Sequence, residues 1–215
     1  MGRTGHASSL GEIDVLHLTF LPPAAPGSYN RFVGVQLREL TDLRQAVISY
    51  GDSRLRTTGD PRAILVDVND LSIAHRVVLL LPERIRKLAF RGVGSRESLI
   101  YLWQIQRLLP LLKPKLIVCY DNYKFGFFLR SAVTWPARVV LSQHGHSYFL
   151  PPATGTRVYQ LESFDAVVTL TESSYRYDRR RLHAYEPLVA VIPNGVDTDR
   201  FRPVAVGQRA RLRST

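Results

Sequence analysis

The chain has 215 residues, which is enough for one domain of ordinary size and too few for two full ones. Hydrophobic residues make up 45% of it and charged residues only 22%, which excludes an intrinsically disordered chain. Its 29 Lys and Arg against 18 Asp and Glu give a formal net charge of +11, which favours polyanionic surroundings such as nucleic acid, anionic lipid headgroups or phosphorylated substrates.

Cysteine content and hydropathy limit the compartment. The single cysteine, Cys119, cannot form an internal disulfide, so nothing in the sequence requires an oxidising environment. No apolar run approaches the roughly 18 to 20 residues that span a bilayer, and residues 1–7 lack the apolar segment of a signal peptide. We therefore expect a cytoplasmic protein, either soluble or peripheral at the inner membrane surface.

Apolar runs rich in β-branched residues alternate with helical periodicity along most of the chain. After a polar leader at 1–12, the expected strands are 13–20, 46–50, 115–120, 138–142, 165–170 and 188–192, with weaker strand signals at 63–67 and 76–81. The expected helices begin near Asn30, at Ser95 with an interruption at Pro110, and at Thr171, and two more cover 125–132 and 155–162. Short connections between alternating strands and helices predict an α/β fold with one doubly wound, mostly parallel, Rossmann-like sheet over 13–193.

Ligands of such sheets bind beyond the carboxyl ends of the strands, which selects a few loops before any motif is considered. These loops are 21–29, 121–124, 143–148, 171–173 and 194–197. In the first, Gly27 and Ser28 stand at a helix start, where free backbone N–H groups favour a phosphate. A flexible turn capped by serine explains the same residues equally well.

The loop after the strand at 138–142 contains two histidines, His144 and His146, on either side of Gly145. We expect no metal there, because no third ligand at suitable spacing and no CxxC or HExxH pattern accompanies them. Two interpretations stay open. Either His144 uses the flexible glycine to approach the hydroxyl groups of a ligand, or both imidazoles only cap loops.

A resemblance to a known family adds to this reading. Residues 191–203, Val-Ile-Pro-Asn-Gly-Val-Asp-Thr-Asp-Arg-Phe-Arg-Pro, resemble the passage between the two domains of retaining GT-B glycosyltransferases of family 4. The Pro-rich loop at 22–28, the strand entry at 114–118, His144-Gly145, and the segment 164–172 are similar to further motifs of that family, in the same order. The resemblance extends over residues 13–203.

The resemblance implies an N-terminal domain that mainly holds the acceptor and a C-terminal domain that holds a nucleotide-sugar donor, usually without a metal or another cofactor. By position, His144 would hydrogen-bond the transferred sugar and act as the catalytic residue. Gly27, Ser28, Gly145 and Asn194 would lie on the donor side, with Ser28 where the family usually has a second glycine. The acceptor, a glycan or a lipid-linked sugar, would meet Tyr29, Asp121, Asn122 and His146.

The family's donor domain carries two glutamates separated by seven residues, and no pair of glutamates in this sequence has that spacing. We therefore expect residues 194–215 to begin an interdomain linker with a basic tail, and the donor domain to be absent from the chain. The chain alone is then expected to be inactive. It would be half of an enzyme, a truncated gene product, or one subunit of a split transferase whose donor domain is a separate chain. The alternative is a non-catalytic partner subunit of a split transferase.

Nine basic and two acidic residues lie between positions 76 and 115, interleaved with large apolar residues. Such a segment is typical of a surface that docks on an anionic membrane, and equally of a solvated helix face. A module that binds nucleic acid would also explain the charge, but no standard nucleic-acid recognition motif is present, so we do not expect nucleic acid as a partner.

Overall fold

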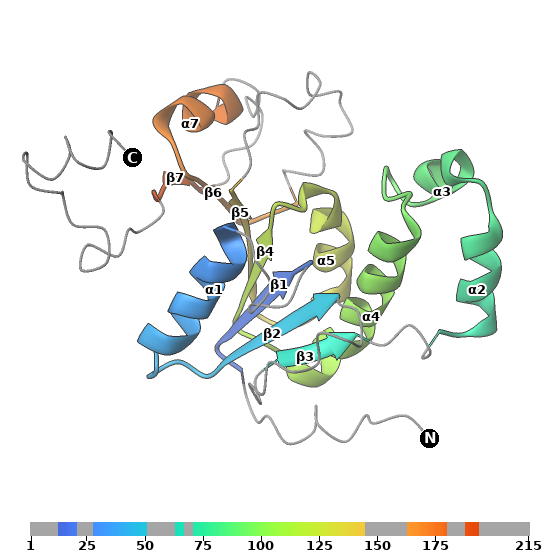
Figure 1. The fold of residues 1–215 in the computed structure, drawn as a ribbon, viewed down its shortest axis with the longest axis horizontal. Coiled ribbons are helices and arrows are strands. Elements are labelled where there is room, and N and C mark those ends of the chain that lie inside the picture. Colours follow the sequence, from blue (N-terminus) through green and yellow to red (C-terminus); the bar gives the residue numbers. More distant parts are fainter. Residues whose placement is uncertain are drawn as a thin grey trace, which may run out of the picture.

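The computed structural model describes the backbone of residues 13–20, 28–50, 63–66, 71–144, 163–179 and 188–193. Side chains are described for the same residues except 28–31, 63–66, 177–179 and 188. Within these residues the chain forms one parallel sheet with helices on both faces (Figure 1). The α/β, doubly wound, Rossmann-like fold predicted from the sequence is confirmed.

The described part of the chain contains a seven-stranded sheet whose order is β3-β2-β1-β4-β5-β6-β7. Every pairing between neighbours is parallel. Its strands are β1 (Val15–Thr19), β2 (Gln45–Tyr50), β3 (Ala63–Val66), β4 (Leu116–Tyr120), β5 (Arg138–Gln143), β6 (Ala166–Thr169) and β7 (Leu188–Val191). The order reverses at β1 and β4, so the crevice that serves as a ligand site in this fold opens beside these two strands.

Helices connect the strands. They are α1 (Ser28–Glu39), α2 (Ile73–Leu80), α3 (Glu83–Ala89), α4 (Arg96–Leu112), the 3-10 turn η4 (Tyr123–Phe125), α5 (Gly126–Ala132) and α7 (Glu172–Arg179). Figure 1 shows α1 on one side of the sheet and α4 and α5 on the other. None of the described helices is both long and apolar enough to cross a membrane.

The two faces of the sheet bury different cores. Alternate strand residues such as Leu16, Ile48 and Ile117 pack with α4 and α5 in a large apolar cluster. The opposite face contributes Val47 and Tyr120 to a smaller cluster with Val33 and Leu37 of α1. Successive side chains of a strand point to opposite faces of the sheet. Strand residues two positions away from Val47 or Tyr120 therefore also lie on the α1 face.

Most predicted elements are confirmed to within two residues, including the weak strand β3 and the cap of α4, where Ser95 accepts the N–H of Ser98 at 3.1 Å. The interruption expected at Pro110 is wrong, because α4 continues to Leu112. A proline in the last turn of a helix costs only one backbone hydrogen bond, and Lys113 ends this helix in a left-handed conformation. The helix expected over 155–162 lies outside the described residues.

The strand signal at 76–81 is also wrong, because these residues belong mainly to α2. Ser72 caps that helix by accepting the N–H of His75 at 3.3 Å, and Pro82 begins the connection to α3. The serine cap before these residues and the proline after them favour a short helix more strongly than the two β-branched valines disfavour it. The short helix α3 was not predicted.

Candidate functional site

The carboxyl ends of β1, β4 and β5 bring polar side chains to one level of the sheet. Tyr120 is in register with Ser142, and Thr19 follows the pair formed by Leu18 and Cys119, which places it level with Tyr120. His144 lies two residues beyond Ser142, so both point to the face that α1 covers. The sequence therefore places a tyrosine, a serine and a histidine around one end of the crevice.

His144 is held by contacts from two neighbouring strands. Its backbone N–H donates to Oδ1 of Asp121 at 2.6 Å, and its Nε2 lies 3.2 Å from the hydroxyl oxygen of Ser142. Its ring lies between those of Phe32 and Tyr120, with centroids 5.4 and 5.6 Å away. The imidazole is therefore fixed in position and direction by its neighbours before any ligand binds.

Asp121 has the backbone conformation needed to make this contact. It follows β4 directly and has φ of 54°, in the left-handed region that aspartate tolerates better than most residues. Its own N–H donates to the carbonyl oxygen of Ser142 at 3.0 Å. The turn thus returns the carboxylate across the end of β5, where it accepts from His144. This positioning role was not assigned from the sequence.

Burial lowers the pKa of His144 from its ordinary value of 6.5, and the nearby carboxylate of Asp121 only partly opposes this shift. The half-buried ring is therefore neutral at pH 7. A neutral imidazole has one nitrogen that donates and one that accepts, and the Ser142 hydroxyl can pair with either form. Such a ring is suited to hydrogen-bonding a sugar hydroxyl and unsuited to acting as a permanent cation.

A buried hydrogen-bond network holds the Tyr120 side chain in place through its hydroxyl group. The Tyr120 hydroxyl lies 3.0 Å from both Nδ1 of His17 and Oε1 of Gln36. On the other side of His17, Nε2 lies 3.0 Å from Oε1 of Gln45, whose amide nitrogen donates to the carbonyls of Gln36 and Leu40. Gln45 is therefore the acceptor and His17 Nε2 carries the proton. Burial lowers the pKa of His17, so its Nδ1 carries no proton. The Tyr120 hydroxyl can donate its single hydrogen either to Oε1 of Gln36 or to Nδ1 of His17.

Other buried polar atoms lie near the same ends of the strands without a hydrogen-bond partner in the described part of the structure. They are Thr19 Oγ1, Ser49 Oγ and Gln143 Oε1. Buried polar atoms are almost always hydrogen-bonded, because leaving one unpaired costs on the order of 1 to 3 kcal/mol.

The other predicted site residues are placed as follows. Asn122 follows Asp121, and its carbonyl accepts from Sγ of Cys119 at 3.5 Å. Ser28 and Tyr29 open α1, and only their backbone is described. Outside the described residues lie Gly27, Gly145, His146 and Asn194. The donor and acceptor roles of all these residues stay predictions.

Sequence reasoning missed Phe32, Tyr120 and Ser142 around His144. The signal for two of them was available, because Tyr120 and Ser142 end two neighbouring strands and side chains at the ends of parallel strands share one edge. Phe32 gave no such signal. It lies one turn inside α1, where an aromatic residue is ordinary core material.

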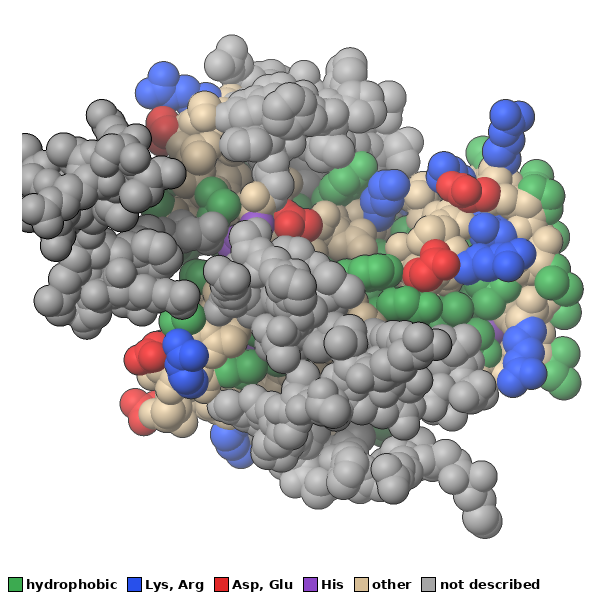
Figure 2. Space-filling model, viewed as in Figure 1, with side chains coloured by type: hydrophobic (Ala, Val, Ile, Leu, Met, Phe, Trp, Pro, Cys, Tyr) green, Lys and Arg blue, Asp and Glu red, His purple; other side chains and the backbone are tan. Residues whose placement is uncertain are grey.

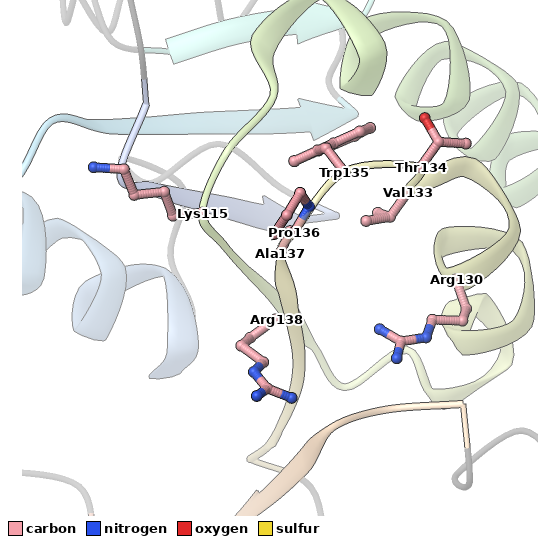
Figure 3. Close-up of a pocket in the computed structure, with 8 residues that line it drawn as sticks. All are labelled: Lys115, Arg130, Val133, Thr134, Trp135, Pro136, Ala137 and Arg138. Carbon is pink, nitrogen blue, oxygen red and sulfur yellow. The ribbon is translucent and has the colours of Figure 1, made fainter.

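A hollow of about 600 Å³ lies at the opposite end of the sheet, beside the amino ends of the strands (Figure 3). Lys115 and Arg138, at the starts of β4 and β5, line it with Arg130 and Trp135. Its cations already have acidic partners: Asp14 lies 2.8 Å from Lys115, and Asp165 binds both arginines at 3.2 and 3.4 Å. These pairs make the hollow part of the scaffold and not a free anion site.

The described residues contain no group of three or more His, Cys, Asp or Glu side chains that could hold a metal ion. His144 has an aspartate nearby, but the contact runs through the histidine backbone and not its ring.

Comparison with known proteins agrees with this architecture. A family profile described as Glycosyltransferase Family 4 matches residues 53–200, which is more than half of the chain. The chain belongs to Glycosyltransferase Family 4. It corresponds to the N-terminal domain of this GT-B family, as the sequence motifs predicted. No curated protein sequence matches the chain significantly.

Among solved structures, the chain is similar to sucrose-phosphate synthase from Thermosynechococcus elongatus, with a TM-score of 0.56 and 16% identity. The alignment covers 93% of this chain and 52% of that one. Phytolacca americana UGT2, solved with UDP-2fluoro-glucose and pterostilbene, aligns with a TM-score of 0.46 and 9% identity over 87% of this chain and 55% of its own. The chain thus spans about half the length of these structures. At these identities the likeness concerns the fold.

Proposed function

We propose that this domain forms the acceptor-side wall of a glycosyltransferase that moves a sugar from a nucleotide-sugar donor to a glycan or lipid-linked acceptor, with retention at the anomeric carbon. Membership in Glycosyltransferase Family 4 supports the reaction class. The observation that carries the proposal is the fixed position of His144 after β5, the strand next to the switch point, in contact with Asp121, Ser142 and two aromatic rings.

In this proposal His144 contacts the transferred sugar. Its neutral ring hydrogen-bonds a sugar hydroxyl, and the bond strengthens as charge develops at the reacting carbon. Asp121 and Ser142 are positioning residues, because they hold the backbone and the ring of His144. Tyr120 forms the wall behind the imidazole, and the His17 network keeps that wall in place.

The nucleotide-sugar is the co-substrate, and the other wall of the cleft comes from a donor domain. The glutamate pair that this family uses for the donor has no counterpart in these 215 residues. We therefore expect no turnover from the chain by itself and turnover when a donor domain of the same family is supplied, either fused to it or as a separate chain.

The test is transfer and hydrolysis of a panel of UDP-, GDP- and ADP-sugars by the chain alone and by its complex with a donor domain. In the active complex, His144→Ala should lower kcat roughly ten- to hundredfold, the value expected for one lost transition-state hydrogen bond. His75→Ala is the matched control, because His75 is also partly buried but stacks on Trp103 of α4. Robust transfer by the chain alone, or equal effects of the two substitutions, would contradict the proposal.

A further inference from the structure

The helices α2 and α3 and the turn between them expose six large apolar side chains. Ile73, Leu80 and Leu88 are 82%, 77% and 81% exposed. Val77, Leu81 and Ile85 are also exposed and lie between them in the sequence, and we call these six side chains the apolar row. The spacing of three or four residues places these side chains on one side of each helix, so the exposure belongs to a face and not to scattered positions.

This face is distinct from the side by which the two helices are attached. On the attached side, His75 stacks on Trp103 with centroids 4.1 Å apart, and Leu79 and Phe90 pack against the large core. None of the residues of α2 is buried, although the helix is mostly apolar. Figure 1 shows α2 and α3 at the outer end of the molecule, with α4 between them and the sheet.

The corner between α2 and α3 is fixed by Arg86. Its side chain is 6% exposed, and its guanidinium donates to the carbonyl oxygens of Gly94 at 2.8 Å and Leu79 at 3.2 Å, and to that of Leu81. The exposed apolar face is therefore held in one orientation by a buried cation. The buried cation thus fixes an apolar face that has no apolar partner among the described residues. We infer that something outside the described residues covers this face in use.

The same corner carries a strong positive charge. Residues 71–96 contain six Lys and Arg and one acid, Glu83. Glu83 pairs with Lys87 at 2.7 Å, and Arg76 and Arg84 are exposed cations beside the apolar row. Figure 2 shows blue basic side chains and green apolar ones together at this end of the molecule.

We propose that the α2–α3 face, defined by the six apolar residues above with Arg76, Arg84 and Lys87, binds the surface of an anionic lipid bilayer. Apolar side chains that enter the boundary of the acyl chains, with cations at headgroup level, are the pattern of an interfacial helix. A second copy of this chain would bring two positively charged faces together. A polyanion such as nucleic acid would match the charge but would leave the apolar row in water.

The orientation of α4 links this face to the candidate site. Helix α4 leads into the start of β4, so it runs opposite to the strands and its N-terminus, at Arg96, lies towards their carboxyl ends. The α2–α3 corner directly precedes that N-terminus. Bilayer binding does not rest on the proposed function. Taken together with it, the binding favours an acceptor that is carried on a lipid.

The direct test is co-sedimentation of the 215-residue chain with vesicles of phosphatidylcholine alone and of an equimolar mixture of phosphatidylcholine and phosphatidylglycerol. We expect binding to the mixed vesicles only, weakened by salt. No sugar or nucleotide is present, so this outcome is independent of glycosyl transfer.

Two sets of substitutions separate the apolar and the charged contributions. Ile73→Gln with Leu80→Gln and Leu88→Gln should weaken binding at least about tenfold, because several buried methylene groups are lost from the lipid contact. Arg76→Gln with Arg84→Gln should weaken it about fivefold for each charge. The matched controls are Leu111→Gln, 67% exposed at the far end of α4, and Arg38→Gln on α1.

Fluorescence of the two tryptophans of the chain gives a readout that needs no substitution of a residue of the face itself. Trp103 lies under α2, whereas Trp135 lines the hollow beside the amino ends of the strands. With phosphatidylcholine that carries a nitroxide on its headgroup, fluorescence of the Trp135→Phe protein, which reports Trp103, should be quenched more than that of Trp103→Phe.

Several results would overturn the proposal. They are the absence of binding to mixed vesicles at low salt, binding that the apolar set leaves unchanged, and stronger quenching of Trp135 than of Trp103. Self-association that the apolar set abolishes, measured by sedimentation velocity without lipid, would assign the face to a second copy. Equal binding of duplex DNA by the wild type and the apolar set, with no vesicle binding, would assign it to nucleic acid.

Discussion

Arg86 allows the sharpest test of how the α2–α3 corner is built. The substitution Arg86→Met keeps most of the apolar stem and removes the guanidinium that joins Leu79, Leu81 and Gly94. Hydrogen bonds to a charged group contribute roughly 1.5 to 3 kcal/mol each, but the three share one cation and are not additive. Gly94 is buried and would lose its side-chain partner, while water can reach the carbonyl of the exposed Leu81.

We expect Arg86→Met to destabilise the corner by about 3 kcal/mol. The assay is hydrogen exchange of the amides of Leu81 and Phe90, which bond to Val78 and Arg86 within the two helices, together with urea unfolding followed by circular dichroism. Lys87→Met is the matched control. Lys87 is the next residue in α3, and its pair with Glu83 is exposed, so little change is expected.

The result that refutes this reasoning is equal protection of the corner amides in the two variants. It would mean that the contacts of Trp103 with His75 and Phe90 hold the helices by themselves, and that the buried cation adds nothing to them. If protection against hydrogen exchange is lost only at the amides of α2 and α3, and the urea midpoint is unchanged, the corner opens on its own while the sheet stays folded.

Three further predictions concern buried groups. Because burial lowers the pKa of His17, the unfolded chain takes up a proton near pH 6.5 while the folded chain does not. The free energy of unfolding should therefore fall as pH drops below 6.5, by at most about 1.4 kcal/mol per pH unit. This part of the slope should vanish in His17→Gln. Burial raises the pKa of Cys119 to about 12, so its thiol should react with iodoacetamide at pH 8 only after unfolding in urea, and labelling of the native protein at the rate of a free thiol would contradict the structure. With the pKa of His144 lowered, kcat of the active complex should stay constant as pH falls through 6.5 and decline only below it. A decline centred at 6.5 would mean that the ring is solvent-exposed, and one centred above 6.5 that the Asp121 carboxylate outweighs the effect of burial.

The sequence predicts the fold well because the strongest signals are local. β1, β4 and β5 are short apolar runs bounded by prolines or polar turns, and α4 starts at a serine cap. The error at 76–81 also has a local cause. Five consecutive apolar residues fit a buried strand or a short helix equally by periodicity, and here the cap at Ser72 and the proline at 82 decide for the helix.

The site is less predictable, because its contacts join residues that are far apart in the chain. The sequence singles out His144, because it follows a strand at the end of the sheet where ligands bind and because the family motif contains it. It does not reveal that Asp121, 23 residues earlier, holds the histidine backbone. That contact needs both the left-handed turn at Asp121 and the register of β4 with β5, and neither can be read from composition.

Strand order and register also explain why His17 supports the wall behind His144, although 103 residues separate it from Tyr120. β1 and β4 are neighbours because the strand order reverses there: β2 and β3 lie on one side of β1, and β4 and the later strands lie on the other. His17 is in register with Val118, which lies two residues before Tyr120 on the same face. Buried polar groups are almost always hydrogen-bonded, and on that face the ring of His17 and the hydroxyl of Tyr120 lie within hydrogen-bond distance of each other. The switch point that creates the ligand crevice thus also creates the polar network beneath it, and a change at His17 should therefore reach His144 through the Tyr120 ring without touching any ligand.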